Sequence, residues 1–224
     1  MYKTIYLIAL FVMLLAFASY ANGQLPAPRV SFVVITSPRA SETGFRTSSS
    51  IVRLKYSSDA RFGPFVISSH GGSRGYSSTV PEGGAGVVDV GFQSEGRHQI
   101  YVTVVATRSV NGVQAAAGSP RVPIIYDLSG PLVVASGRRD GDLLSLRGMI
   151  MDDYSPISSL DVVIRIDEKT YRPTIGPDGS WKLSIKAPAQ SRLIDGVTIF
   201  GRETLDDGTV QKGESVWLSV DELE

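Results

Sequence analysis

The stretch Val162-Val163-Ile164-Arg165-Ile166-Asp167 alternates apolar and charged residues with a period of two. Its aliphatic residues Val162, Ile164 and Ile166 share one face, and the two charged residues share the other. Successive side chains of a strand point to opposite faces of a sheet. A strand with one wet face is typical of an antiparallel sheet, so this stretch predicts an antiparallel strand.

The same alternation recurs along the chain, whereas helical periodicity is nearly absent after the N-terminal apolar run. Strands are predicted at Val30–Ile35, Ile51–Tyr56, Gln99–Val104, Trp181–Lys186 and Val216–Val220. Dipeptides that tolerate positive φ in tight turns separate such runs: Asn111-Gly112, Asp140-Gly141, Asp178-Gly179, Asp195-Gly196 and Asp207-Gly208. Short strands at this spacing favour an all-β fold built from sandwiches.

A boundary between two domains is predicted at Asp127-Leu128-Ser129-Gly130-Pro131. Arg121–Tyr126 is predicted to be the last strand before it, and Leu132–Ala135 to begin the first strand after it. Each half offers about seven strand-like runs in about 100 residues, as an immunoglobulin-like sandwich requires. We therefore expect two tandem antiparallel sandwiches, at residues 24–126 and 127–224.

The N-terminus has the layout of a secretory signal peptide, predicted at residues 1–23. Lys3 precedes an apolar run from Ile5 to Phe17, and small residues permit cleavage after Ala21 or Gly23. An uncleaved anchor is the alternative, but the run is shorter than the roughly 20 residues of a spanning helix. No cysteine follows it and no second long apolar run occurs, which argues against a lipoprotein and a membrane span.

The chain contains no cysteine. This excludes thiol catalysis, cysteine metal sites and redox roles. Exported animal domains of this size usually carry disulfides. An exported chain without them is therefore predicted to be bacterial, and to be periplasmic, extracellular or attached to the cell surface.

The net charge is zero but unevenly distributed. Residues 24–126 hold ten basic and five acidic residues, a net charge of +5, and residues 127–224 hold eleven and seventeen, a net charge of −6. This asymmetry has three interpretations. The two halves attract each other, neighbouring molecules stack head to tail, or the charges simply keep the surfaces of two ordinary domains solvated. These three interpretations leave the oligomeric state open.

The second half carries four short motifs in order. They are Asp127-Leu-Ser-Gly-Pro131, Leu144-Ser-Leu-Arg-Gly-Met-Ile-Met-Asp152-Asp153, Leu160-Asp-Val-Val-Ile-Arg-Ile-Asp167 and Asp178-Gly-Ser-Trp181-Lys-Leu-Ser-Ile185. Together they resemble the bacterial immunoglobulin-like (Big-type) repeats of exported surface proteins. Met149 and Met151 stand where such repeats usually have smaller residues, and Phe200–Gly208 matches their pattern loosely. The resemblance implies a non-enzymatic surface module.

The first half shares only the predicted number of strands, and its Gly71-Gly72 and Gly83–Gly86 segments are predicted to be loops. One of these loops overlaps a Gly-x-Ser-x-Gly pattern, His70-Gly71-Gly72-Ser73-Arg74-Gly75. Asp89 and His98 follow in the order that a serine hydrolase uses. No helix pattern follows Ser73, so the match is interpreted as a glycine- and serine-rich loop, and no catalytic residue is predicted.

Acidic residues cluster at Asp127, Asp152-Asp153, Asp167-Glu168 and Asp206-Asp207. Calcium binds several oxygen ligands that converge from loops, so a calcium site at the junction is one interpretation. Aspartates that bond to their own backbone in turns are the other, and the favoured one. No other metal or cofactor is predicted, because the two histidines, His70 and His98, are too few for a histidine site.

Alternation places Trp217 on the face of Ser215 and Ser219, away from the core, whereas Trp181 is predicted to be buried. An exposed tryptophan stacks on sugars or anchors a protein partner. Tyr76 and Tyr171 are lesser candidates.

The favoured function is an exported binding or structural module that acts in envelope assembly or surface adhesion through protein–protein contacts. A carbohydrate-binding accessory module is the alternative, and a serine hydrolase using Ser73 is a distant third. The basic residues of the first half are scattered and not interleaved with aromatics, so no nucleic-acid partner is expected. The binding residues stay undefined at this stage.

Overall fold

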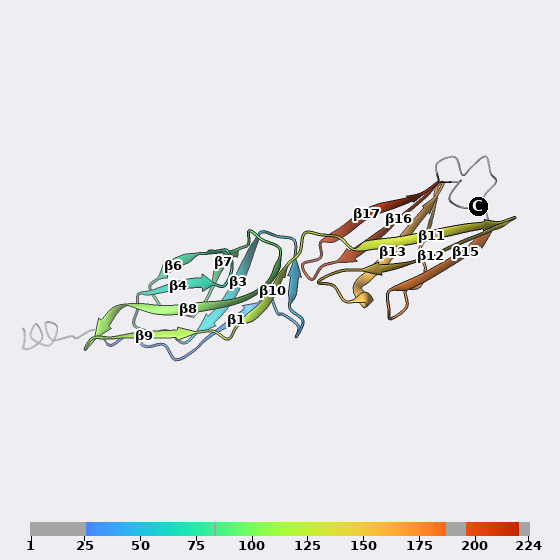
Figure 1. Ribbon diagram of the computed structural model, residues 1–224. Coiled ribbons are helices and arrows are strands. Elements are labelled where there is room, and N and C mark those ends of the chain that lie inside the picture. Colours follow the sequence, from blue (N-terminus) through green and yellow to red (C-terminus); the bar gives the residue numbers. More distant parts are fainter. Residues whose placement is uncertain (1–25, 83, 187–195, 220–224) are drawn as a thin grey trace, which may run out of the picture.

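The computed structural model describes residues 26–82, 84–186 and 196–219. These residues form strands almost throughout, with one short 3-10 helix, η1 (Ile157–Ser159), so the all-β prediction is confirmed. No helix in the described ranges has the length and apolar character needed to cross a bilayer. The predicted signal peptide lies outside the described residues and stays a prediction. Figure 1 shows two elongated sandwiches arranged end to end.

The N-terminal half, residues 26–126, forms two sheets with strand orders β1-β3-β7-β5 and β2-β10-β8-β4-β6, and β9 pairs with β8. Its strands are β1 (Val33–Ser37), β2 (Phe45–Thr47), β3 (Ile51–Ser58), β4 (Phe65–His70), β5 (Arg74–Gly75), β6 (Ser77–Val80), β7 (Ala85–Gly91), β8 (Gly96–Val110), β9 (Val113–Gly118) and β10 (Val122–Tyr126). The prediction of about seven strands for this half was too low. The short strands β2, β5 and β6 have too few residues to show alternation. Pairing is antiparallel except between β10 and β2, which run parallel.

The prediction of a loop at Gly83–Gly86 was wrong at its end, because Ala85 and Gly86 begin strand β7. Gly86 lies opposite the buried Tyr56 of β3, and a Cβ there would come within 2.5 Å of the Tyr56 hydroxyl. Gly86 therefore leaves space for the Tyr56 side chain and does not form a turn. Gly71 and Gly72 do lie in a loop, after β4, as predicted.

The C-terminal half, residues 127–219, forms sheets with orders β11-β12-β15 and β14-β13-β16-β17. Its strands are β11 (Leu132–Asp140), β12 (Leu143–Met151), β13 (Leu160–Ile166), β14 (Lys169–Tyr171), β15 (Ser180–Lys186), β16 (Val197–Thr204) and β17 (Val210–Leu218). The hairpin β11–β12 lies in one sheet and β13–β14 in the other. Strand β15 then returns beside β12, and β16 and β17 complete the second sheet. This is an immunoglobulin-like antiparallel sandwich.

Each half has its own buried core, one between Val33 and Tyr126 and one between Val133 and Leu218. Trp181 is 2% exposed, as alternation predicted. It lies opposite Gly148 of β12, where a Cβ would overlap the Val134 carbonyl oxygen and come within 2.5 Å of Trp181 Cζ2. The glycine and the tryptophan of two separate sequence motifs therefore form one packing unit.

Candidate functional site at the junction of the two halves

The segment from Asp127 to Pro131, here called the hinge, is packed tightly between the two halves. The Asp127 backbone N–H donates to Thr47 O of β2 at 2.9 Å. On the other side, a Cβ at Gly213 of β17 would overlap the Pro131 carbonyl oxygen, and one at Gly130 would lie 2.5 Å from Gly213 N. Because backbone meets backbone at this contact, the hinge is held in place by β17.

Arg46 of β2 crosses from the N-terminal half into the C-terminal half. It is 8% exposed, and its guanidinium Nη1 lies 3.4 Å from Glu203 Oε2 of β16. Its Nη2 lies 3.3 Å from Asp206 Oδ1. An arginine presents several donors in a planar fork and stays charged, so one side chain bonds both carboxylates.

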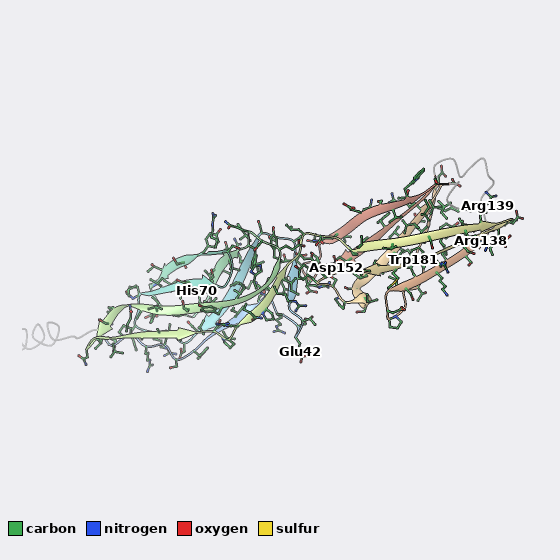
Figure 2. All side chains as sticks on the ribbon, viewed as in Figure 1. Glu42, His70, Arg138, Arg139, Asp152 and Trp181 are labelled. Atoms are coloured by element: carbon green, nitrogen blue, oxygen red, sulfur yellow. The ribbon has the colours of Figure 1, made fainter. Side chains whose placement is uncertain are left out.

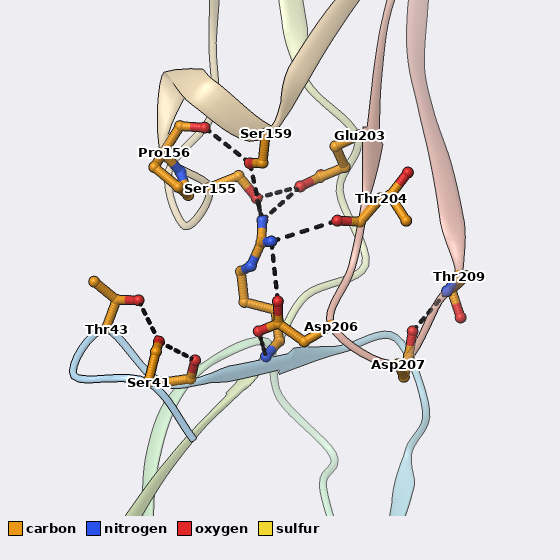
Figure 3. Close-up of polar contacts among 12 residues, drawn as sticks. Ser41, Thr43, Ser155, Pro156, Ser159, Glu203, Thr204, Asp206, Asp207 and Thr209 are labelled. Carbon is orange, nitrogen blue, oxygen red and sulfur yellow. Dashed lines mark hydrogen bonds and ion pairs between the residues drawn. The ribbon is translucent and has the colours of Figure 1, made fainter. Parts of the chain in front are cut away.

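Further hydrogen bonds complete the contact around Arg46 (Figure 3). Its Nη1 also donates to the hydroxyls of Ser155 and Ser159, and its Nη2 donates to Thr204 O at 3.4 Å. The backbone joins as well: Arg46 N donates to Asp206 Oδ2 at 2.8 Å, and Asp206 N donates to Arg46 O at 3.2 Å. The contact is therefore formed from both main chain and side chain.

Three carboxylates converge at the same junction. Asp127 directly follows β10, Asp152 directly follows β12, and Glu203 lies near the end of β16. One oxygen from each lies within 4.8 Å of the others. Figure 2 places Asp152 in the region where the two sandwiches meet. Oxygen ligands on converging segments are the donor set of a hard divalent cation.

Several oxygens of these carboxylates, and the amide oxygen of Gln211 beside Asp127, have no hydrogen-bond donor among the described residues. They are Asp127 Oδ1, Asp127 Oδ2, Glu203 Oε1 and Gln211 Oε1. Asp127 is fully buried, and Glu203 is 1% exposed. A buried charged group without a partner costs several kcal/mol unless it takes up a proton or a cation.

Burial raises the pKa of Asp127 from 3.8 to about 7, and nearby Glu95, Asp152 and Glu203 add to the rise. Burial likewise raises the pKa of Glu203, although Ser155 and Arg46 oppose that rise. The pKa of Glu95 falls to about 2, chiefly because the Ser129 hydroxyl donates to it. Without a cation, Asp127 therefore holds a proton below about pH 7.

Ser73 of the Gly-x-Ser-x-Gly pattern and the two residues that follow it, Asp89 and His98, each bond to other partners. Ser73 Oγ accepts from Gln93 N at 3.0 Å, and Asp89 forms an ion pair with Arg53 at 3.2 Å. The ring of His98 bonds to Ser94 O at 3.1 Å. Each member of the pattern is thus occupied by a local partner, which supports the interpretation of this segment as a structural loop.

The acidic pairs divide between the two interpretations. Asp167 and Glu168 lie in the turn between β13 and β14, and Asp153 is exposed. Asp207 accepts from Thr209 N at 2.8 Å as a turn former, but it also accepts from Thr47 Oγ1 at 2.6 Å across the junction. Asp127 and Asp152 meet at the junction.

The sequence did not indicate Arg46, Glu203 or Gln211. Arg46 was counted among scattered basic residues, and Glu203 lies in a stretch noted only for its loose match. The opposite charges of the two halves were the one available signal, because Arg46 of the basic half is bonded by carboxylates of the acidic half.

Trp217 of β17 is 57% exposed, as predicted, whereas Tyr76 and Tyr171 are half-buried. Among aromatic candidates for a binding surface, Trp217 therefore presents the largest accessible ring. Its position on β17 is near the end remote from the hinge contact at Gly213.

No protein-family model matches the chain, and no curated protein matches it. The predicted membership of the Big-type repeats therefore stays a prediction. The chain is similar to several solved structures. One is of a 1.5-MDa bacterial ice-binding adhesin and concerns host cell surface retention. It is 16% identical to this chain with a TM-score of 0.49, over 88% of this chain and 66% of that chain. This chain therefore spans less than two thirds of the adhesin structure.

Two further structures are similar. The fibronectin(III)-like modules of Clostridium thermocellum CbhA are 17% identical with a TM-score of 0.37, over 84% of this chain and 94% of that one. An ICAM-5 D1-D4 ectodomain fragment is 13% identical with a TM-score of 0.34, over 83% of this chain and 52% of that one. At such low identities and TM-scores, these similarities assign neither a ligand nor an activity.

Proposed function

We propose that the chain is a non-enzymatic exported module that positions and binds other proteins at the cell envelope or cell surface. The junction carries this proposal. Arg46 is bonded to Glu203 and Asp206 of the other half, and the hinge is packed against Gly213. Two sandwiches joined in this way form a stiff spacer, whereas a solvated linker would let them move independently.

An exposed apolar patch supplies a surface for protein–protein contact. On the outer face of β11 and β12, Leu132 lies opposite Met151 and Val134 lies opposite Met149. All four side chains are about half exposed. Grouped apolar side chains on a soluble surface mark interaction sites, and methionine adapts its shape to a partner. Met149 and Met151 are also larger than the residues usual at these positions in the bacterial immunoglobulin-like repeats that this half resembles.

The test compares capture of proteins from the envelope fraction of the source cells. Wild type is compared with a Val134→Lys/Met149→Lys variant and with a Val113→Lys control, which changes an exposed valine of β9 in the other half. We expect one protein to be retained by wild type and by the control and to be lost with the double variant. Equal retention by all three would contradict a binding role for the patch.

A carbohydrate-binding module is the second candidate, because Trp217 is 57% exposed and a flat indole stacks on sugar rings. Titration with soluble envelope polysaccharide would then change tryptophan emission in wild type and not in a Trp217→Phe variant. An unchanged emission in wild type would remove this candidate. Periplasmic and extracellular locations are both compatible with either function.

A further inference from the structure

We propose that the junction binds one Ca²⁺ through Asp127, Asp152, Glu203 and Gln211. The ion would tie together the ends of three strands and the hinge. The proposal rests on the donor set at the junction and does not depend on the proposed function.

Each of the three carboxylates has an oxygen that is available to bind a cation. Asp152 uses Oδ1 to accept the Tyr154 and Ser155 backbone N–H groups, both at 2.8 Å, so Oδ2 is its available oxygen among the described contacts. Glu203 uses Oε2 for Ser155 and Arg46, and no donor in the described part of the chain reaches its Oε1. Neither oxygen of Asp127 accepts a hydrogen bond from a donor among the described residues.

Gln211 provides an independent indication of a ligand. It is neutral, it is 9% exposed, and its Oε1 has no donor within the described part of the chain. Its Nε2 donates to Asp127 O at 2.7 Å, which places its amide beside the hinge. Gln211 of β17 also lies directly opposite Glu203 of β16, and opposed residues of antiparallel strands share a face. The Gln211 side chain therefore lies on the face of Glu203 and next to Asp127, and its amide oxygen is an unpaired buried acceptor among the described residues.

The charge at the junction fits a divalent ion. Three carboxylates converge, Glu95 lies near Asp127, and Arg46 divides its contacts between Glu203 and Asp206. The carboxylates at the junction therefore outnumber the cationic side chain of Arg46, and this excess of negative charge favours a divalent cation. Carboxylate and amide oxygens select hard cations. Calcium accepts irregular sets of 6–8 oxygens, whereas magnesium demands near-ideal octahedral geometry. Ligands from the hinge and three strand ends favour calcium.

The test is calorimetric titration of the EDTA-treated chain with CaCl₂, with MgCl₂ in parallel. We expect one Ca²⁺ per chain with a dissociation constant of about 1 mM or below, as in extracellular calcium modules. Asp127→Asn and Asp152→Asn, each close in shape to the original residue, should weaken binding at least about tenfold, as loss of a charged ligand does. Asp153→Asn is the matched control, because Asp153 is the exposed neighbour of Asp152, and it should leave binding unchanged.

Circular dichroism and thermal unfolding of each variant show whether it folds, so loss of binding is separable from loss of structure. A rise in the unfolding temperature with CaCl₂ in wild type and in Asp153→Asn, absent from the other two variants, would support the site. No saturable Ca²⁺ binding up to about 10 mM, or equal binding by all four proteins, would overturn it. Binding of Mg²⁺ alone would overturn the assignment to calcium.

Discussion

Arg46 Nη1 lies 3.4 Å from Glu203 Oε2, an ion pair that joins the two sandwiches with both side chains at least nine-tenths buried. Desolvation makes such a pair a weak source of net stability, but removal of one partner leaves the other charge buried and unpaired. The pair therefore makes separation of the two halves costly. The two cores are therefore connected through a buried contact.

Replacement of Arg46 by methionine should destabilise the chain strongly. Glu203 and Asp206 would lose their cation, and loss of one partner of a buried pair costs about 3–5 kcal/mol. Urea unfolding measures this free energy. Arg53→Met is the control, because Arg53 pairs with Asp89 on the surface with 72% of its side chain exposed. Exposed pairs are worth about 0–1 kcal/mol, so equal losses in the two variants would be inconsistent with a structural role for Arg46.

Between pH 5 and 8, stability should fall as pH rises in the presence of EDTA. The pKa of Asp127 is about 7 in the folded chain, above its ordinary 3.8, so the folded state holds more protons between these values. Its contribution is complete below pH 3.8 and is lost as pH rises toward 7. At 1.36 kcal/mol per pKa unit the change is about 4 kcal/mol at most. Asp127→Asn should flatten the slope of unfolding free energy between pH 5 and 8, and an unchanged slope would show that another group titrates.

Gly148→Ala should destabilise the C-terminal half. The added Cβ would overlap the Val134 carbonyl oxygen, which belongs to the backbone of β11 and cannot rotate away, and would press on Trp181. Overpacking of this kind costs about 1–3 kcal/mol or more. Gly84→Ala is the control, because no atom of the described residues lies within 4 Å of a Cβ there. Thermal unfolding of the two variants should differ by several degrees, and equal unfolding temperatures would refute the packing of Gly148 on Trp181.

The sequence predicted the fold class and much of the strand pattern because alternation is local. Val162, Ile164 and Ile166 reach one core, and Trp181 is buried as its alternation required. Short strands could not be predicted from alternation. Strand β2, for example, has three residues, which are too few to show a period. Gly86 was assigned to a loop because its role, making room for Tyr56, depends on a strand elsewhere in the chain.

The candidate site was predictable only in part. Asp127 and Asp152 were noted as acidic residues beside predicted strand ends. Glu203 and Gln211 meet them through the pairing of β16 with β17, and Arg46 through the packing of β2 on the other half. Such contacts join residues separated by up to 160 positions. Local patterns do not report them, and only the overall charge difference between the halves pointed in this direction.

Tryptophan emission should separate the two indoles. Trp181 is buried and Trp217 is more than half exposed, so the wild-type spectrum should combine a short-wavelength and a long-wavelength component. Trp217→Phe should leave only the short-wavelength component, and acrylamide should then quench it weakly. A spectrum unchanged by this substitution would contradict the exposure of Trp217.

The stiffness of the junction can be measured directly because the chain contains no cysteine. Spin labels on introduced cysteines at Ser78 and Lys182, exposed positions on β6 and β15, report the distance between the two halves by electron–electron double resonance. We predict one narrow distance distribution in the otherwise unchanged chain and a broad one when Arg46→Met is added. A broad distribution in the chain that retains Arg46 would contradict a junction that holds the two sandwiches as one unit.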